Sequence, residues 1–248
     1  IRYTQIIKNL LLNNRHLIVT GPTGTGKTVN LMDVITRGMT EKHTSLIINF
    51  SAQTSAGQTQ MAIDDKLKQK TRKDFAPPNN KIMVILLDDL NMPKKEKFGA
   101  QPPIEIIRQW MDFKGWYNLK KSEKPFINIQ NLIFCGGMGH PGGGRAPLSN
   151  RFMRHFHLIN YTELSEASII SIFERKVKHF LKSFTEEVKD NISIFVKSTL
   201  DVYKEIQENL LPIPKTPHYQ FNLRDMSKVL QGVCMTSVKY TTNKLECA

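Results

Sequence analysis

One short segment constrains this chain more than any other. Residues 21–28 read GPTGTGKT and match the spacing Gly-x4-Gly-Lys-Thr. An apolar run at 16–20 precedes the segment and an apolar-periodic stretch at 29–39 follows it, which predicts a strand, a tight loop and a helix. Glycines let backbone N–H groups approach a phosphate closely, and the helix start adds a favourable dipole. We therefore predict a phosphate-binding P-loop made of Gly21, Pro22, Thr23, Gly24, Thr25, Gly26, Lys27 and Thr28.

Three side chains would complete a site for ATP or ADP with Mg²⁺. Lys27 is placed to reach the β and γ phosphates, and the Thr28 hydroxyl to ligate Mg²⁺. Asp88 directly follows 81–87, the strongest apolar run in the chain. The carboxyl end of a neighbouring parallel strand lies beside a P-loop, so Asp88 is expected to hold Mg²⁺ through water.

Asp89 is the candidate for the base that activates the attacking water. A carboxylate at this position often polarises that water, but it is commonly Glu, and Asp is one methylene shorter. A displacement of about 1 Å can cost on the order of 100-fold in rate. Both interpretations, a competent base and an ineffective one, remain open at this stage.

Strand and helix patterns alternate over the first 160 residues. Apolar runs at 45–50, 81–87 and 131–135 predict further strands, the last followed by a glycine-rich loop at 136–144. The stretch 51–73 is polar with a charged helical tail, and 103–113 predicts an amphipathic helix. This alternation predicts an α/β fold with a doubly wound parallel sheet over residues 1–160.

Residues 161–248 have a different character. Apolar side chains recur every three or four residues, as in Ile169, Phe173 and Val177, which predicts helices. A break with Pro212, Pro214 and Pro217 follows, and then Asn222 with Asp225 three residues on resembles a capping box. We expect a small all-helical domain here.

Composition excludes some classes of protein and leaves one open. No apolar run approaches the roughly 20 residues that span a bilayer, so no membrane protein is predicted. The net charge of +13 invites a nucleic-acid partner, but the basic residues are interleaved with acids rather than aromatics, which leaves nucleic-acid binding a remote alternative. The chain starts at Ile1, within a helical pattern, so we expect a segment of a longer protein.

Several runs together resemble the dynein heavy chain. They are NFSAQTSA at 49–56, LNMP at 90–93, GAQPPIE at 99–105, RQW at 108–110 and GGGRAPLSNRF at 142–152. The resemblance extends from about Tyr3 to Gly232. Over this range the chain is similar to one AAA+ module of the motor ring, and most similar to the third module of an axonemal dynein. It implies a P-loop AAA+ fold, with a parallel five-stranded sheet sandwiched by helices plus a small helical lid.

The resemblance also implies a function and partners. A P-loop ATPase module would bind and slowly hydrolyse ATP to gate the ring in microtubule-based motility; the alternative is a nucleotide-bound regulatory module without hydrolysis. The partners would be neighbouring AAA+ modules of the same heavy chain, microtubules through a distant stalk, and dynein intermediate and light chains. The expected location is the cytoplasm and cytoskeleton, in the axoneme of a cilium or flagellum.

Three further positions take roles from the family. Arg151 matches an arginine finger that acts in trans on the nucleotide of the neighbouring module, whereas Arg154 is better read as a salt-bridge residue. Arg224 matches the sensor arginine of the lid, aimed at a γ-phosphate. Met138 lies nearest to the place of a polar sensor, and a thioether cannot donate a hydrogen bond, which favours slow hydrolysis.

Overall fold

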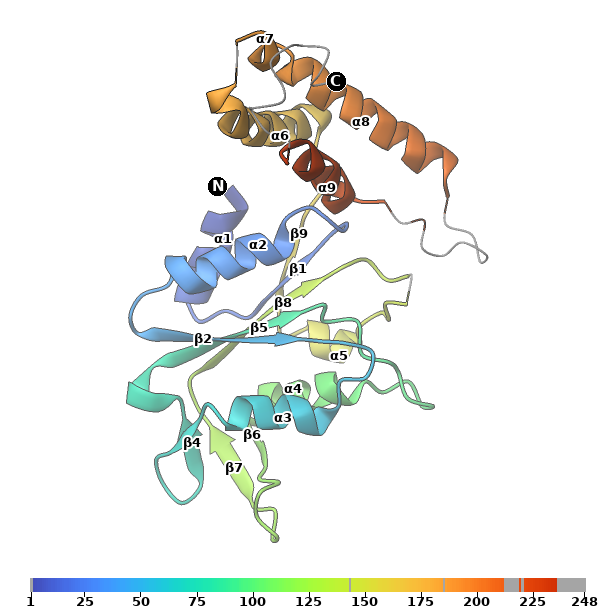
Figure 1. Ribbon diagram of the computed structural model, residues 1–248. Helices are drawn as coiled ribbons and strands as arrows, with labels where there is room; N and C mark the ends of the chain where they lie inside the picture. The colour runs from blue at the N-terminus through green and yellow to red at the C-terminus, as the bar shows by residue number, and fades with distance from the viewer. Residues whose placement is uncertain (1, 143, 185, 212–218, 220, 236–248) are drawn as a thin grey trace. The chain divides into compact units, whose positions relative to one another are not determined.

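A computed structural model of the chain describes residues 2–142, 144–184, 186–211, 219 and 221–235 (Figure 1). The predicted break at Pro212, Pro214 and Pro217 and the last residues, 241–248, lie outside the described residues. The chain divides into two compact units, one of residues 1–22 with 26–162 and one of residues 23–25 with 163–248.

The first unit is built on a parallel sheet of five strands in the order β2-β5-β8-β1-β9 (Figure 1). All four strand pairs are parallel, so each strand must return by a crossover, and helices supply these crossovers. The prediction of a parallel five-stranded α/β sheet is confirmed. The strands are β1 (Leu17–Thr20), β2 (His43–Asn49), β5 (Ile82–Asp88), β8 (Leu132–Met138) and β9 (His157–Asn160).

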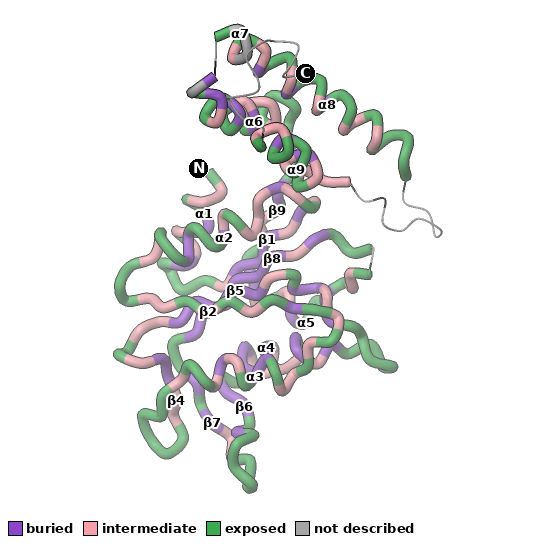
Figure 2. Tube along the Cα trace, in the orientation of Figure 1, coloured by how far each residue is buried: buried purple, intermediate pink, exposed green. Residues whose placement is uncertain are grey.

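Helices cover both faces of this sheet (Figure 1). On one face, α1 (Arg2–Leu12) and α2 (Lys27–Asp33) pack with Val84 and Leu86 of β5. On the other, α3 (Ala56–Asp64) and α4 (Pro102–Phe113) pack with the alternate β5 residues, such as Ile85. Since both faces of β5 are buried, the strand is a continuous apolar run in sequence, and it appears as a buried segment in Figure 2.

Several predicted boundaries in this unit are wrong. Strand β2 spans His43–Asn49 rather than 45–50. The helix after the P-loop begins at Lys27 rather than Val29, and past Asp33 it continues as a π-helical turn, η1 (Val34–Gly38). Strand β8 does not end at Cys135 but continues through Gly136 and Gly137 to Met138. The glycines stay in the strand because β8 is paired on both sides, with Gly136 opposite Leu87 of β5 and Ile18 of β1.

A second sheet of four short strands was not predicted. Its order is β3-β4-β7-β6, from β3 (Lys68–Gln69), β4 (Asp74–Ala76), β6 (Gly115–Tyr117) and β7 (Phe126–Ile129). The charged tail expected to be helical is therefore a hairpin, followed by the 3-10 turn η2 (Pro78–Asn80). Buried Trp110 and Trp116 join this sheet to the helices, since their indole N–H groups donate to the Ile129 carbonyl and the Asp64 carboxylate, both at 3.0 Å.

The described part of the second unit is helical beyond residue 165. Its elements are α6 (Glu166–Phe180), η3 (Leu181–Ser183), α7 (Glu186–Lys189), α8 (Ile192–Asn209) and α9 (Leu223–Val233). The core contains Phe173 and Val177 of α6, Val196 of α8 and Leu230 of α9. The capping box predicted from Asn222 and Asp225 opens α9, and the helical lid is confirmed.

Candidate nucleotide-binding site

The P-loop leaves the end of β1 in a conformation that only glycine adopts readily. Gly21 has a φ of 146°, and a Cβ at this position would collide with the Tyr161 carbonyl oxygen. Gly26, with a φ of 81°, is the N-cap of α2, and no atom lies within 4 Å of where its Cβ would be. Glycine is therefore required for different reasons at the two positions: the Tyr161 backbone lies too close for a Cβ at Gly21, and the backbone at Gly26 is left-handed.

Lys27 folds back over the loop that precedes it. Its Nζ donates to the carbonyl oxygens of Gly21, at 2.9 Å, and Pro22, at 2.5 Å. The ammonium group thus lies against the P-loop backbone, from which it can turn to a phosphate oxygen.

Thr28 and Asp88 meet although 60 residues separate them. The Thr28 hydroxyl, in the first turn of α2, donates to Asp88 Oδ1 at the end of β5, at 3.0 Å. A Cβ on Gly137 of β8 would lie 3.0 Å from the same carboxylate oxygen. Glycine at 137 therefore leaves the space that the Asp88 carboxylate occupies. This role of Gly137 was not predicted, although the Gly-Gly pair at the end of an apolar run is a visible signal in the sequence.

The described residues contain no cluster of three or more His, Cys, Asp and Glu side chains that could hold a metal ion. Mg²⁺ suits the smaller oxygen set of Thr28 and Asp88, since this ion usually keeps several waters and takes few protein ligands in addition to substrate phosphates. The two oxygens thus fit the metal that the P-loop implies.

Asp89 is exposed and has a left-handed backbone, with a φ of 51°. Asp and Asn tolerate this conformation better than other side chains except glycine. The backbone is held by two hydrogen bonds, from Leu90 N to Gly137 O (3.0 Å) and from Met92 N to Asp89 O (2.9 Å). The turn geometry thus gives a physical reason for the short carboxylate at position 89.

Asn91 is a buried polar residue that the sequence analysis did not single out. Its side chain, 1% exposed, donates from Nδ2 to the Gly139 carbonyl oxygen at 2.9 Å. The backbone carbonyl oxygen of Asn91 accepts from Ala146 N at 3.0 Å. Asn91 therefore ties the turn that carries Asp89 to the segment that follows β8.

Met138 is the last residue of β8 and packs against the core on the α3 and α4 side of the sheet. This packing accounts for an apolar side chain at a position where a polar sensor was sought. His140, two residues on, is exposed.

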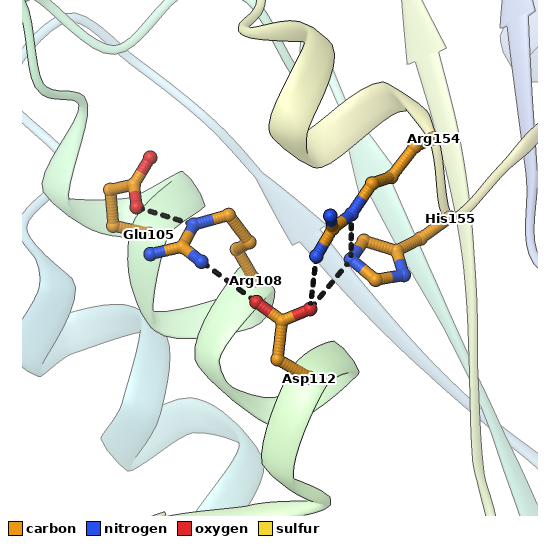
Figure 3. A network of polar contacts seen from close by, with 5 residues as sticks. All are labelled: Glu105, Arg108, Asp112, Arg154 and His155. Carbon is orange, nitrogen blue, oxygen red and sulfur yellow. Dashed lines mark hydrogen bonds and ion pairs between the residues drawn. The ribbon is translucent and has the colours of Figure 1, made fainter.

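Arg151 and Arg154 lie at α5 (Asn150–Met153) and differ in their surroundings. Arg151 is exposed and forms no ion pair among the described residues. Arg154 Nη2 lies 2.8 Å from Asp112 Oδ1, so the salt-bridge interpretation holds for Arg154 (Figure 3). His155 Nε2 lies 3.1 Å from the same oxygen. Neither Asp112 nor His155 was predicted to take part.

Arg224 lies in the first turn of α9 in the second unit and is exposed. Its backbone N–H donates to Asn222 Oδ1 at 2.8 Å, within the capping box. The cap thus satisfies the backbone of this turn, while the guanidinium is left accessible to solvent.

The fold and the site define the class of protein. A parallel sheet of this strand order, a P-loop between β1 and α2, an acidic end of β5 and a helical lid make the chain a P-loop AAA+ module. Residues 1–164 match the model of the P-loop containing dynein motor region, and residues 195–247 match that of the AAA+ lid domain. The chain belongs to the dynein motor family.

Curated relatives agree with this assignment. The chain is 41% identical to dynein axonemal heavy chain 1 of Homo sapiens over 247 residues, which cover 95% of this chain and 6% of that protein. It is 38% identical to dynein axonemal heavy chain 2 of Mus musculus, covering 98% of this chain and 5% of that protein. The chain therefore spans only a small part of the length of these relatives. Among the described residues, no helix is both long enough and apolar enough to cross a membrane.

Proposed function

We propose that the chain is an ATP·Mg-binding AAA+ module of a dynein motor ring that hydrolyses ATP slowly and thereby gates the conformation of the ring. The hydrogen bond between Thr28 and Asp88 carries this proposal, because it brings the two expected Mg²⁺ ligands together beside the P-loop.

In this function, the P-loop amides and Lys27 bind the phosphates, and Thr28 and Asp88 hold Mg²⁺, directly and through water. When bound there, Mg²⁺ would supply charge neutralisation at the β and γ phosphates. Asp89 orients the attacking water, and Arg224 contacts the γ-phosphate. Arg151 stabilises transition-state charge on the nucleotide of the neighbouring module rather than on the chain's own ATP.

Two observations support slow turnover. The left-handed turn at Asp89 favours a short carboxylate, which has less reach than Glu. Met138 packs into the core and has no hydrogen to donate to water or phosphate. These features equally favour a second candidate, a module that holds nucleotide as a regulatory switch without hydrolysis.

Single-turnover hydrolysis in the assembled ring separates the two candidates. Asp89→Asn is the sharpest variant, because Asn also tolerates the left-handed backbone and differs only in losing the carboxylate. The hydrolysing module predicts a loss of about 100-fold at this site with nucleotide binding intact. If the wild-type site shows bound nucleotide and no chemistry, the switch is the function. If the site binds no nucleotide, the proposal is wrong.

We infer the wider context from the relatives and the resemblance. The proposed partners are neighbouring AAA+ modules of the same heavy chain, microtubules through a distant stalk, and dynein intermediate and light chains. The proposed place is the axoneme, because the relatives named above are axonemal dynein heavy chains. The proposed position in the ring is the third module, on the resemblance described in the sequence analysis.

A further inference from the structure

Asp112 is the meeting point of three basic side chains from two helical segments. Its Oδ2 accepts from Arg108 Nη1 of α4 at 2.7 Å. Its Oδ1 accepts from Arg154 Nη2 at 2.8 Å and lies 3.1 Å from His155 Nε2. Figure 3 shows these side chains converging on the one carboxylate.

The contacts on the α4 side of this cluster do not involve α5. Arg108 Nε also donates to Glu105 Oε2 at 2.6 Å, so Arg108 is held between two acids on its own helix. The Asp112 side chain is only 17% exposed, which limits screening by solvent. The Arg154 hydrogen bond, foremost, and the nearby Arg108 and His155 charges lower the pKa of the Asp112 carboxyl. Arg108, held on α4 by Glu105, therefore fixes the Asp112 carboxylate as an anionic partner for Arg154.

Helix α5 needs such a support. It has four residues, far too few for a helix to be stable by its own hydrogen bonds. Phe152 anchors it on one side, since this ring is fully buried and packs on Phe156 with 4.7 Å between ring centroids. Arg154 anchors its end to α4 through Asp112, and its Nε donates to His155 Nε2 at 3.3 Å. Arg151, exposed, sits directly before Phe152 and three residues before Arg154.

We propose that Asp112 is a positioning residue for Arg151: by holding Arg154, it fixes the orientation in which α5 presents Arg151 to the neighbouring module. This inference rests on the proposed role of Arg151 as a finger in trans. The physical basis is that a catalytic group displaced by about 1 Å can lose on the order of 100-fold in rate.

A double-mutant cycle in the assembled ring tests this inference. The readout is single-turnover ATP hydrolysis at the neighbouring module that Arg151 faces. Asp112→Asn keeps the volume and removes the charge, and Arg154→Gln removes only the α5 side of the pair in case Asp112→Asn fails to fold. Asp65→Asn is the matched control, because Asp65 pairs with Lys120 at 2.7 Å on the exposed surface, without contact to α5.

We expect Arg151→Ala to slow hydrolysis by about 1,000-fold, Asp112→Asn and Arg154→Gln by about 10-fold each, and Asp65→Asn not at all. The decisive result is the loss of the Asp112→Asn effect in the Arg151→Ala background, because a merely structural role would slow both backgrounds equally. Arg154→Lys, which keeps the charge, should recover part of the rate.

Three results overturn the proposal. If Asp112→Asn slows both backgrounds by the same factor, Asp112 is structural only. If Arg151→Ala slows hydrolysis but Asp112→Asn and Arg154→Gln both hydrolyse at the wild-type rate, Arg151 acts as the finger and the proposed positioning by Asp112 is wrong. If Arg151→Ala hydrolyses at the wild-type rate, the finger assignment fails and this inference fails with it.

Discussion

The Thr28 hydroxyl lies 3.0 Å from Oδ1 of Asp88, which links the first turn of α2 to the end of β5. The hydroxyl is the donor, so the carboxylate keeps its remaining lone pairs for water or metal. Gly137 of the adjacent strand is the third participant, because a Cβ there would lie 3.0 Å from Asp88 Oδ1 and crowd this carboxylate. The geometry of the proposed metal site thus depends on three elements that are distant in sequence.

Thr28→Val should weaken binding of Mg·ATP by about 10-fold while changing the affinity for metal-free ATP little, because the isosteric side chain loses only the hydroxyl that is proposed to bind the metal. Calorimetric titration with Mg²⁺ and with EDTA measures both affinities. Thr36→Val is the matched control, since the exposed Thr36 donates to Met32 O in the continuation of the same helix. Equal losses with and without Mg²⁺ would show that the substitution disturbs the P-loop instead.

Gly137→Ala should lower the affinity for Mg·ATP by about 3- to 10-fold, because the new Cβ would lie 3.0 Å from Asp88 Oδ1 and displace the carboxylate from Thr28. Gly57→Ala in α3 is the control: nothing lies within 4 Å of its Cβ, and the change should stabilise the chain by about 0.5 to 1 kcal/mol. Binding assays and chemical denaturation of both variants test the pair. Unchanged Mg·ATP affinity in Gly137→Ala would contradict the role given to this glycine.

Much of the fold and part of the site can be predicted from the sequence, because these features depend on residues that lie close together along the chain. The P-loop and the β5 strand are continuous motifs, and a strand buried on both faces is recognisable as an unbroken apolar run. The capping box of Asn222 and Asp225 is equally local. Each of these features depends on residues within about eight positions, so sequence spacing was enough to place them.

The remainder depends on pairing between distant segments. The hairpin of β3 and β4 exists because β4 pairs with β7, more than 50 residues away, and this overrides the helical character of a charged stretch. Asp112 lies in no motif, and the LNMP run does not say what Asn91 contacts; the roles of these residues come from Arg154 and from the Gly139 carbonyl, which only the fold brings near. Spacing along the chain contains no signal for such contacts.

Asn91→Ala should lower the free energy of unfolding by about 1 to 3 kcal/mol, because it leaves the buried Gly139 carbonyl oxygen without its side-chain donor. Urea denaturation of the chain measures this loss. Asn9→Ala, on the exposed face of α1, removes an amide that accepts from Gln5 and should change stability by less than about 0.5 kcal/mol. Similar small effects in the two variants would show that the Asn91 hydrogen bond contributes little.

His16 should make the chain less stable as the pH falls from about 6.5 to about 4. Burial, chiefly, with the charges of Lys114, His155 and His157, lowers the pKa of His16 from 6.5 to about 4, and its Nδ1 accepts a hydrogen bond from Phe134 N at 3.0 Å. Between these pH values the unfolded chain binds the extra proton, so the contribution is fully present above pH 6.5 and lost towards pH 4, about 3 kcal/mol in all. His16→Asn keeps an acceptor for Phe134 N–H but does not titrate, and should flatten this part of the stability profile measured by urea denaturation.

His179→Gln, on the exposed side of α6, should leave the profile as it is. If the wild type and His16→Asn lose stability in parallel from pH 6.5 to 4.5, carboxylates rather than His16 cause the acid sensitivity.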